Sequence, residues 1–222
     1  MPGAALMART APLSLEAALA AEGRRVIAGV DEAGRGAWAG PVVAGAVCLP
    51  LDVPDLADQL SGLTDSKQLT PAARARYAER IRAVAAAWGV GEASAAEIDE
   101  IGILRATCAA MRRAAEALRA SFPAAAPEYY LLDHIHWRGA LLDQPWKTIV
   151  RGDSRSLSIA AASVLAKTHR DALMVALGDE YPGYGFAAHK GYGTPEHQAA
   201  LAALGTTPAH RMSFAPLRPT LL

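Results

Sequence analysis

The chain has 222 residues, 52% of them hydrophobic, which suits one sizeable domain with an ample core. Its 22 basic residues balance 22 acidic ones, but this does not exclude a nucleic-acid-binding protein, because bound cations can neutralise a site built from carboxylates. No apolar stretch is long enough to span a membrane, and no signal peptide is visible. The two cysteines, Cys48 and Cys108, are too few for a disulfide framework and are expected to be small buried hydrophobes. We therefore expect a cytoplasmic protein without membrane attachment.

The first half of the chain is expected to carry a strand hairpin between helices. Residues 1–12 show little pattern and are predicted to be disordered, which leaves a single domain over residues 13–222. The elements expected are a helix over 14–22 capped by Ser14, strands over 25–31 and 41–49, a polar connection over 51–62, a helix over 71–88, a strand over 89–93 and a helical region over 95–120 broken at Gly102. Thr70-Pro71 and the pair Ser94 and Glu97 are typical helix starts.

In the second half, strands alternate with helices. After a linker over 123–127, we expect strands over 129–132 and 146–150, a helix over 156–177, a glycine-rich loop over 181–194 and a last helix over 195–204. Early strands followed by alternating elements predict an α/β fold, with a mixed central sheet flanked by helices and a small helical C-terminal segment.

Two adjacent acids, Asp31 and Glu32, stand where an apolar run meets Gly34-Arg35-Gly36. A carboxylate out of water must be paired or must bind metal. Glycine on both sides of an arginine lets the main chain approach a ligand closely and present bare N–H groups to it. An ordinary turn with solvated charge would account for one acid and one glycine, but not for the whole run. The run therefore favours metal-assisted chemistry on a nucleic acid.

Three strand-like segments end in acids: Asp31-Glu32, Asp133 and Asp153. Acids at neighbouring strand ends converge in space, and four carboxylates without cysteine or histidine ligand spacing favour Mg²⁺ or Mn²⁺ over zinc. Two such ions can activate a water and stabilise the leaving oxygen of a phosphodiester cleavage. Because adjacent strand residues point to opposite faces, Asp31 and Glu32 share a site only if the strand breaks there, as Gly34 would allow, or if one of them uses its main-chain carbonyl.

Several blocks, in order over about residues 25–211, together resemble the motifs of the ribonuclease HII family. They are Asp31-Glu32-Ala33-Gly34-Arg35-Gly36, Asp65-Ser66-Lys67-Gln68-Leu69, Gly152-Asp153 with the run from Ser158 to Lys167, Arg170-Asp171, the run from His189 to Thr194, and His197. The resemblance implies an RNase H-like fold and hydrolysis of the RNA strand of RNA–DNA hybrids, including cutting at ribonucleotides embedded in duplex DNA. It also implies two Mg²⁺ or Mn²⁺ ions, 5′-phosphate and 3′-hydroxyl products, and roles in repair and replication.

Residue by residue, the resemblance implies catalytic, metal-binding roles for Asp31, Glu32, Asp133 and Asp153. The nucleic-acid contacts that it implies are Gly34, Arg35 and Gly36 at the ribose 2′-OH, Ser66 and Lys67 at a phosphate, Lys190 at the backbone, and Tyr192 stacked on the deoxyribose of the RNA–DNA junction. The chain departs from the family after Asp133, where His134 stands in place of a small residue. No long domain precedes the first motif, which favours this family over the related type HIII enzymes.

Other interpretations remain open for some residues. His134 and His136 could ligate a metal beside Asp133, although exposed or hydrogen-bonded histidines are the simpler expectation. Lys67 could be a solvated loop lysine. The rival functions are another RNase H-like metal nuclease or phosphotransferase, and a non-catalytic hybrid-binding protein. We expect a monomeric enzyme, and cleavage of a duplex with one ribonucleotide would separate these alternatives.

Overall fold

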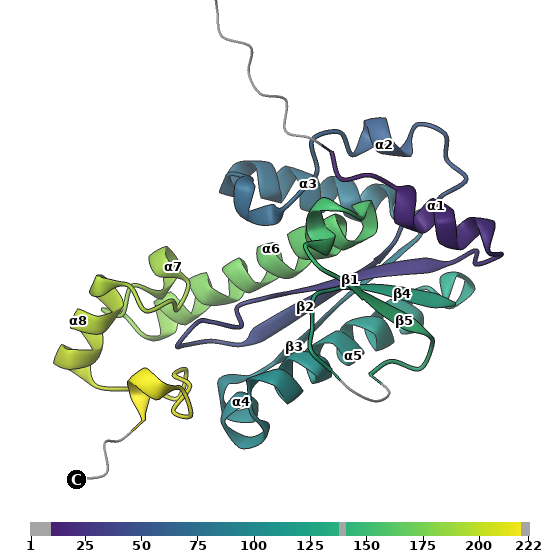
Figure 1. The fold of residues 1–222 in the computed structure, drawn as a ribbon. Coiled ribbons are helices and arrows are strands. Elements are labelled where there is room, and N and C mark those ends of the chain that lie inside the picture. The colour runs from purple at the N-terminus through teal and green to yellow at the C-terminus, as the bar shows by residue number, and fades with distance from the viewer. Residues whose placement is uncertain (1–9, 138–140, 219–222) are drawn as a thin grey trace, which may run out of the picture.

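The computed structural model describes residues 10–137 and 141–218 and contains a mixed five-stranded sheet (Figure 1). The strands are β1 Ile27–Ala33, β2 Val42–Cys48, β3 Ala87–Ala93, β4 Tyr129–Asp133 and β5 Trp146–Ile149, in the order β3-β2-β1-β4-β5. β2 pairs antiparallel with β1 and β3, whereas β1, β4 and β5 run parallel. The predicted mixed sheet is confirmed. Its central strand is β1, which carries the first two acids.

Two long helices cover the sheet, α5 on one face and α6 on the other (Figure 1). The helices are α1 Ser14–Ala21, α2 Leu56–Gln59, α3 Pro71–Val84, α4 Ala95–Ile101, α5 Ile103–Ser121, α6 Leu157–Glu180, α7 Phe186–His189 and α8 Pro195–Leu204. α3 packs on α6, and α7 and α8 form the small helical C-terminal segment predicted from the sequence. None of the helices in the described ranges is long and apolar enough to cross a bilayer.

The backbone of α6 lies directly against β1 and β2, because small residues meet at the contact. A Cβ atom added to Gly29 would lie 2.1 Å from the carbonyl carbon of Ser158, and one added to Gly45 would lie 2.4 Å from the Ala162 oxygen. Alternate residues of a strand share a face, so Asp31 faces α6 together with Gly29. The close contact therefore fixes one acid against the helix.

The chain before β1 is tied to the start of α6. Among residues 10–12, Ala11 donates its N–H to the Leu63 carbonyl, and the Pro12 carbonyl accepts from the Leu157 N–H. Residues 1–9, to which most of the prediction of disorder applies, lie outside the described residues. In α1 the fully buried Glu16 accepts from the Ser156 hydroxyl at 2.5 Å and from the Ser158 N–H at 3.0 Å. A carboxylate at a helix N-terminus is favoured by both the free N–H groups and the helix dipole.

We expect Glu16→Ala to lower the free energy of unfolding by about 2–3 kcal/mol, because charged hydrogen bonds at a buried helix start are lost. Urea unfolding of the two proteins measures this difference. Glu22→Ala, an exposed acid that directly follows α1, is the matched control and is expected to change little. Equal effects of the two substitutions would contradict the role given to Glu16.

Most predicted element boundaries are close to the observed ones, but the end of one helix is wrong. The helix expected over 71–88 ends at Val84, and Trp88 lies in β3, where it pairs with Val47. Pairing across the sheet outweighs the local helical pattern there. Ser14 is not a capping residue, because the N-cap position is Leu13 and makes no side-chain capping bond.

Other local predictions are confirmed or need small changes. The break at Gly102 is present, with φ of 81°, and the Ser94 hydroxyl accepts from the Glu97 N–H. The helix expected to end at Leu177 continues to Glu180, and the loop expected over 181–194 contains the one-turn helix α7. Both cysteines are free and buried, as predicted.

Candidate active site

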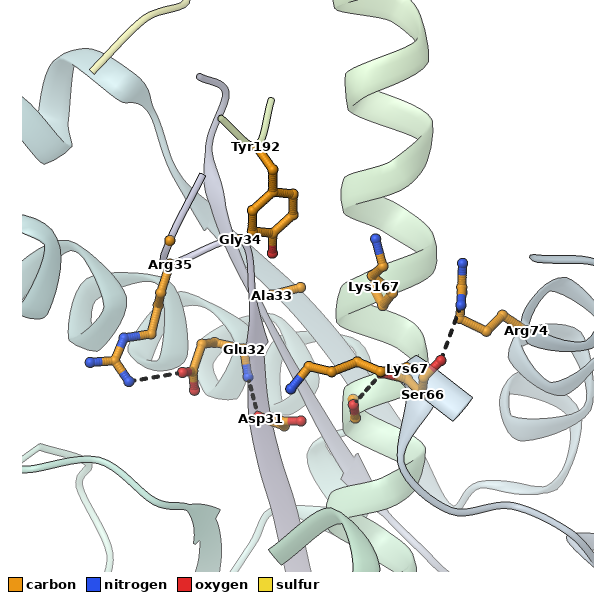
Figure 2. A pocket seen from close by; sticks show the side chains of 12 residues that line it. Asp31, Glu32, Ala33, Gly34, Arg35, Ser66, Lys67, Arg74, Lys167 and Tyr192 are labelled. Carbon is orange, nitrogen blue, oxygen red and sulfur yellow. Dashed lines mark hydrogen bonds and ion pairs between the residues drawn. The ribbon is translucent and has the colours of Figure 1, made fainter. Parts of the chain in front are cut away.

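A cleft of about 650 Å³ opens beside the end of β1, between α6 and the segment that carries Tyr192 (Figure 2). It contains every predicted site residue from the first half of the chain and Tyr192, together with Arg74, Ser163 and Lys167, which were not among the predicted site residues. Its lining residues are Asp31, Glu32, Ala33, Gly34, Arg35, Gly36, Ser66, Lys67, Arg74, Ser163, Lys167 and Tyr192. Segments far apart in the sequence therefore meet at one concave surface.

Asp31 lies on the α6 side of β1 and is only 6% exposed. Burial raises the pKa of its carboxyl well above the usual value, and the nearby charges of Glu32 and Asp133 raise it further. The Glu32 N–H donates to Asp31 Oδ1 at 2.7 Å and offsets part of this effect. Asp31 is thus a nearly buried acid next to other acids, which is a costly arrangement without a cation.

Glu32 points to the other side of the strand, toward Arg35 (Figure 2). β1 does not break between the two acids, since Asp31, Glu32 and Ala33 pair in turn with Gly45, Ala44 and Val43. Glu32 Oε1 accepts from Arg35 Nη1 at 3.2 Å, whereas Oε2 is buried without a hydrogen-bond partner. Burial raises the pKa of this carboxyl, and the Arg35 guanidinium lowers it in part. The predicted break is found only after Ala33, but both acids line the same cleft without a break between them.

Asp133 and Asp153 lie next to this pair but do not line the cleft. Val30 pairs with Leu132 in the parallel ladder, so the next residues along β1 and β4, Asp31 and Asp133, lie side by side. Asp133 Oδ1 accepts from the Gly152 N–H at 2.7 Å. Burial raises the pKa of the Asp153 carboxyl, and the charges of Asp65 and Asp133 add to this effect.

Although these acids are close enough to perturb one another, their oxygens do not already surround a common point. Within residues 10–137 and 141–218, no three histidine, cysteine or acidic side chains are placed to hold one metal ion. In this arrangement Glu32 is turned toward Arg35, and one oxygen of Asp133 is engaged by the Gly152 N–H.

Lys67 extends from the turn Ser66–Gln68 toward the acids (Figure 2). Partial burial alone would lower the pKa of its ammonium group, but the charges of Asp65, Asp31, Asp153 and Asp133 raise it overall. Lys67 is therefore not an isolated solvated lysine. Its ammonium group faces the acids, as the Arg35 guanidinium faces Glu32.

The turn that carries Lys67 is held by contacts that sequence reasoning did not identify. Ser66 Oγ lies 2.7 Å from Ser163 Oγ of α6, and Arg74 donates to the Ser66 carbonyl at 3.1 Å. Arg74 also pairs with Asp171, which in turn binds Lys167. These partners lie up to 97 residues apart, so no local pattern signals their contact. Together they give the cleft a basic side opposite the acids.

The Gly34-Arg35-Gly36 loop and Tyr192 lie on the same wall of the cleft. Gly34 has φ of +93°, and a Cβ atom there would lie 1.9 Å from Arg170 Nε. Both the backbone conformation and the lack of space therefore require glycine. A Cβ on Gly36 would lie 4.0 Å from the Tyr192 ring, which is 40% exposed. The loop and the ring thus present one continuous surface.

The Arg170 side chain lies against both the Gly34-Arg35-Gly36 loop and the Tyr192 ring. Its fully buried guanidinium donates to the carbonyls of Pro41, Lys190 and Ala39 at 2.9, 3.0 and 3.1 Å, and it lies 5.7 Å from the centre of the Tyr192 ring. Burial lowers the pKa of Arg170. Its place in the Arg170-Asp171 block was the only sequence signal for this role.

A second buried arginine supports the same loop. Arg211 Nη1 donates to the Arg35 carbonyl at 3.0 Å, and Nε donates to the Gly40 carbonyl at 2.9 Å. Burial, with a further contribution from the charge of Arg170, lowers the pKa of Arg211 to about 9. The backbone of the Gly34-Arg35-Gly36 loop is therefore held by a hydrogen bond from a buried side chain.

Three further predicted positions lie outside this cleft. Lys190 has a left-handed backbone (φ 54°), and its ammonium group binds the Ala187 carbonyl. His134 and His136 bind each other, with 2.9 Å between their Nε2 atoms, and His136 is exposed. The pairing of the two histidines agrees with the simpler interpretation of this segment.

Comparisons with known proteins agree with this arrangement. The family described as Ribonuclease HII matches residues 28–217. Ribonuclease HII from Roseiflexus castenholzii is 52% identical, over 91% of this chain and 87% of that protein. Ribonuclease H2 from Pyrococcus horikoshii OT3 has 26% identity and a TM-score of 0.72, over 86% of this chain and 95% of that chain. Bst-RNase HIII in complex with Mn²⁺, at 22% identity and a TM-score of 0.71 over 86% of this chain and 68% of that chain, shares the fold.

The mixed sheet and the acids at its strand ends define a nuclease of the RNase H-like fold. Within that class, the chain belongs to the ribonuclease HII family. The predicted fold and the predicted endoribonuclease activity are confirmed, and RNA–DNA hybrids are the substrates of this family.

Proposed function

We propose that Asp31, Glu32, Asp133 and Asp153 hold two divalent ions, Mg²⁺ or Mn²⁺, for phosphodiester hydrolysis. The observation that carries this proposal is the unpartnered, buried Glu32 Oε2 next to Asp31, whose carboxyl has a strongly raised pKa. A hard cation with oxygen ligands fits such a site. When bound, the ions would supply water activation and stabilisation of the leaving oxygen. The relative solved with Mn²⁺ supports the choice of metal.

The chain's own residues would bind and orient the nucleic acid. We assign the loop Gly34–Gly36 to the ribose, since its glycines leave the backbone accessible and the 2′-OH is the group that separates RNA from DNA. Ser66 and Lys67 are assigned to a phosphate, and Lys190 to the backbone outside the cleft. Tyr192 is assigned to stacking on the sugar that follows a ribonucleotide.

We propose that the active form is a monomer, in which one chain supplies the whole cleft. Its wall of glycines and one exposed aromatic ring supports recognition of single ribonucleotides in duplex DNA, in addition to long hybrids. We further propose cytoplasmic action and products with 5′-phosphate and 3′-hydroxyl ends. A non-catalytic hybrid-binding role is disfavoured because all four acids are present.

The proposed function is tested with a DNA duplex that holds one ribonucleotide, compared with the same duplex made wholly of DNA. In Mg²⁺ we expect a single cut at the ribonucleotide and none in the DNA control. Chelation by EDTA should stop the reaction. Cutting of both duplexes would point instead to another RNase H-like nuclease, and binding without any cutting would point to the non-catalytic alternative.

Tyr192→Ala is expected to slow cleavage at a single ribonucleotide by about tenfold to a hundredfold, because a stacking contact is worth about 1–3 kcal/mol. Tyr192→Phe should keep most of the rate. Cleavage rates on the single-ribonucleotide duplex and on a long hybrid measure the effect, which should be smaller on the hybrid. If Phe were as damaging as Ala, the hydroxyl group and not the ring would be the important contact.

A further inference from the structure

Two buried histidines connect the C-terminal segment to the backbone of Tyr192. His197 of α8 is fully buried, and His210 is 2% exposed. Their Nε2 atoms lie 3.1 Å apart, and His197 Nδ1 lies 3.0 Å from the Tyr192 carbonyl oxygen. On the side away from His197, the His210 ring contacts Thr207, whose N–H donates to His210 Nδ1 at 2.9 Å.

The direction of every bond in this chain follows from its two ends. Because a backbone N–H can only donate, His210 Nδ1 accepts from Thr207 and the His210 proton is on Nε2. That proton is donated to His197 Nε2, so the His197 proton is on Nδ1. This is the tautomer that the Tyr192 carbonyl needs, since an oxygen can only accept. The opposite tautomer of His197 would place a lone pair against the carbonyl oxygen.

Both rings are neutral at pH 7, as this chain of bonds requires. Burial lowers the pKa of His210 to about 4, and the charge of His197 adds to the effect. Burial also lowers the pKa of His197. The stacked ring of His189, 4.6 Å from His197, accepts from the Gly191 N–H through Nδ1 and so has its own proton fixed on Nε2.

We propose that His210 and His197 are positioning residues that hold Tyr192 in the cleft, with His210 selecting the His197 tautomer that binds the Tyr192 carbonyl. The proposal rests on the proposed role of Tyr192 at the RNA–DNA junction. It adds to that role the two side chains that hold the Tyr192 ring beside the Gly34-Arg35-Gly36 loop. Trp38, two residues after that loop, packs against the His197 ring with 5.8 Å between centroids and so joins the same unit.

His210→Phe removes the donor to His197 but keeps a ring against Tyr184 and Phe186, which lie 5.2 and 5.4 Å from the imidazole. His197→Asn keeps a donor near the position of Nδ1 and should restore much of what His197→Leu loses. Tyr184→Phe is the matched control. It removes the hydroxyl bonds to the Leu204 and Gly205 carbonyls in the same cluster without touching the histidine chain.

Two measurements test the proposal on the whole protein. ¹⁵N NMR of the imidazoles should show His197 protonated on Nδ1 and His210 on Nε2 in the wild type, and a mixed His197 tautomer in His210→Phe. The ratio of cleavage rates on a single-ribonucleotide duplex and on a long hybrid should fall about tenfold in His210→Phe, the scale of one lost stacking contact. The ratio should be unchanged in Tyr184→Phe.

A His197 proton on Nε2 in the wild type would overturn the proposal. So would an unchanged rate ratio in His210→Phe, or a fall of the same size in Tyr184→Phe. The results would differ if Tyr192 had no role at the RNA–DNA junction. In that case Tyr192→Ala would itself leave the ratio unchanged, while the NMR spectra would still decide whether the histidine chain exists.

Discussion

Asp31→Asn is expected to reduce cleavage of an RNA–DNA hybrid by ~10³-fold or more while leaving hybrid binding nearly intact. The change keeps the shape of the side chain but removes a charge that the proposed metal site needs. The expected loss exceeds the 10–100-fold typical of groups that only orient metal ligands. Single-turnover cleavage in Mg²⁺ and fluorescence anisotropy of a labelled hybrid measure the two properties.

The same substitution should make the metal-free protein more stable at pH 7. The pKa of Asp31 is raised in the folded state, so the folded protein binds its proton more tightly than the unfolded chain does. Its contribution therefore becomes unfavourable as pH rises from the unfolded pKa of about 3.9 through the higher folded value. Removing the charge should therefore raise the free energy of unfolding at pH 7.

Asp52→Asn, an exposed acid between β2 and α2, is the control and should change neither property. Cleavage near the wild-type rate in Asp31→Asn would remove Asp31 from the metal site. A lower free energy of unfolding of Asp31→Asn at pH 7 would contradict the conclusion that the buried charge of Asp31 is destabilising.

Arg170→Met is expected to lower the free energy of unfolding by about 3 kcal/mol or more, since three carbonyls would lose their fully buried donor. Urea unfolding measures this loss. Arg113→Met is the control, because Arg113 also donates to a carbonyl but at an exposed position, so less than about 1 kcal/mol is expected. Similar losses at the two positions would show that the buried contacts of Arg170 are not important for stability.

The strand ends and the arginine loop could be predicted because their signals are local. An apolar run that reaches Asp31 and Glu32, with Gly34 two residues on, marks a buried strand and the turn beyond it, although the strand expected to end at Asp31 continues to Ala33. The wrong end of α3 shows the limit of this approach. Residues near Trp88 continue a helical pattern, and only the pairing of Trp88 with Val47 assigns them to β3.

The supports of the site could not be predicted from local patterns. Glu16 meets Ser156 across 140 residues, and Arg211 meets the Arg35 carbonyl across 176. Each is a buried charged group whose partners become apparent only in the folded protein. Sequence alone also left open how Asp31 and Glu32 could share a site. The unbroken β1 ladder excludes a break between them, and both acids nevertheless line the same cleft.

The most direct test of the proposed metal site uses a single-ribonucleotide duplex in which one non-bridging oxygen of the scissile phosphate is replaced by sulfur. If divalent ions held by Asp31, Glu32, Asp133 and Asp153 contact that phosphate, one stereoisomer should be cut slowly in Mg²⁺. Its rate should recover in Mn²⁺, which accepts sulfur ligands more readily. Equal cleavage of both stereoisomers in both metals, or cleavage that persists in EDTA, would contradict metal-assisted hydrolysis at this site.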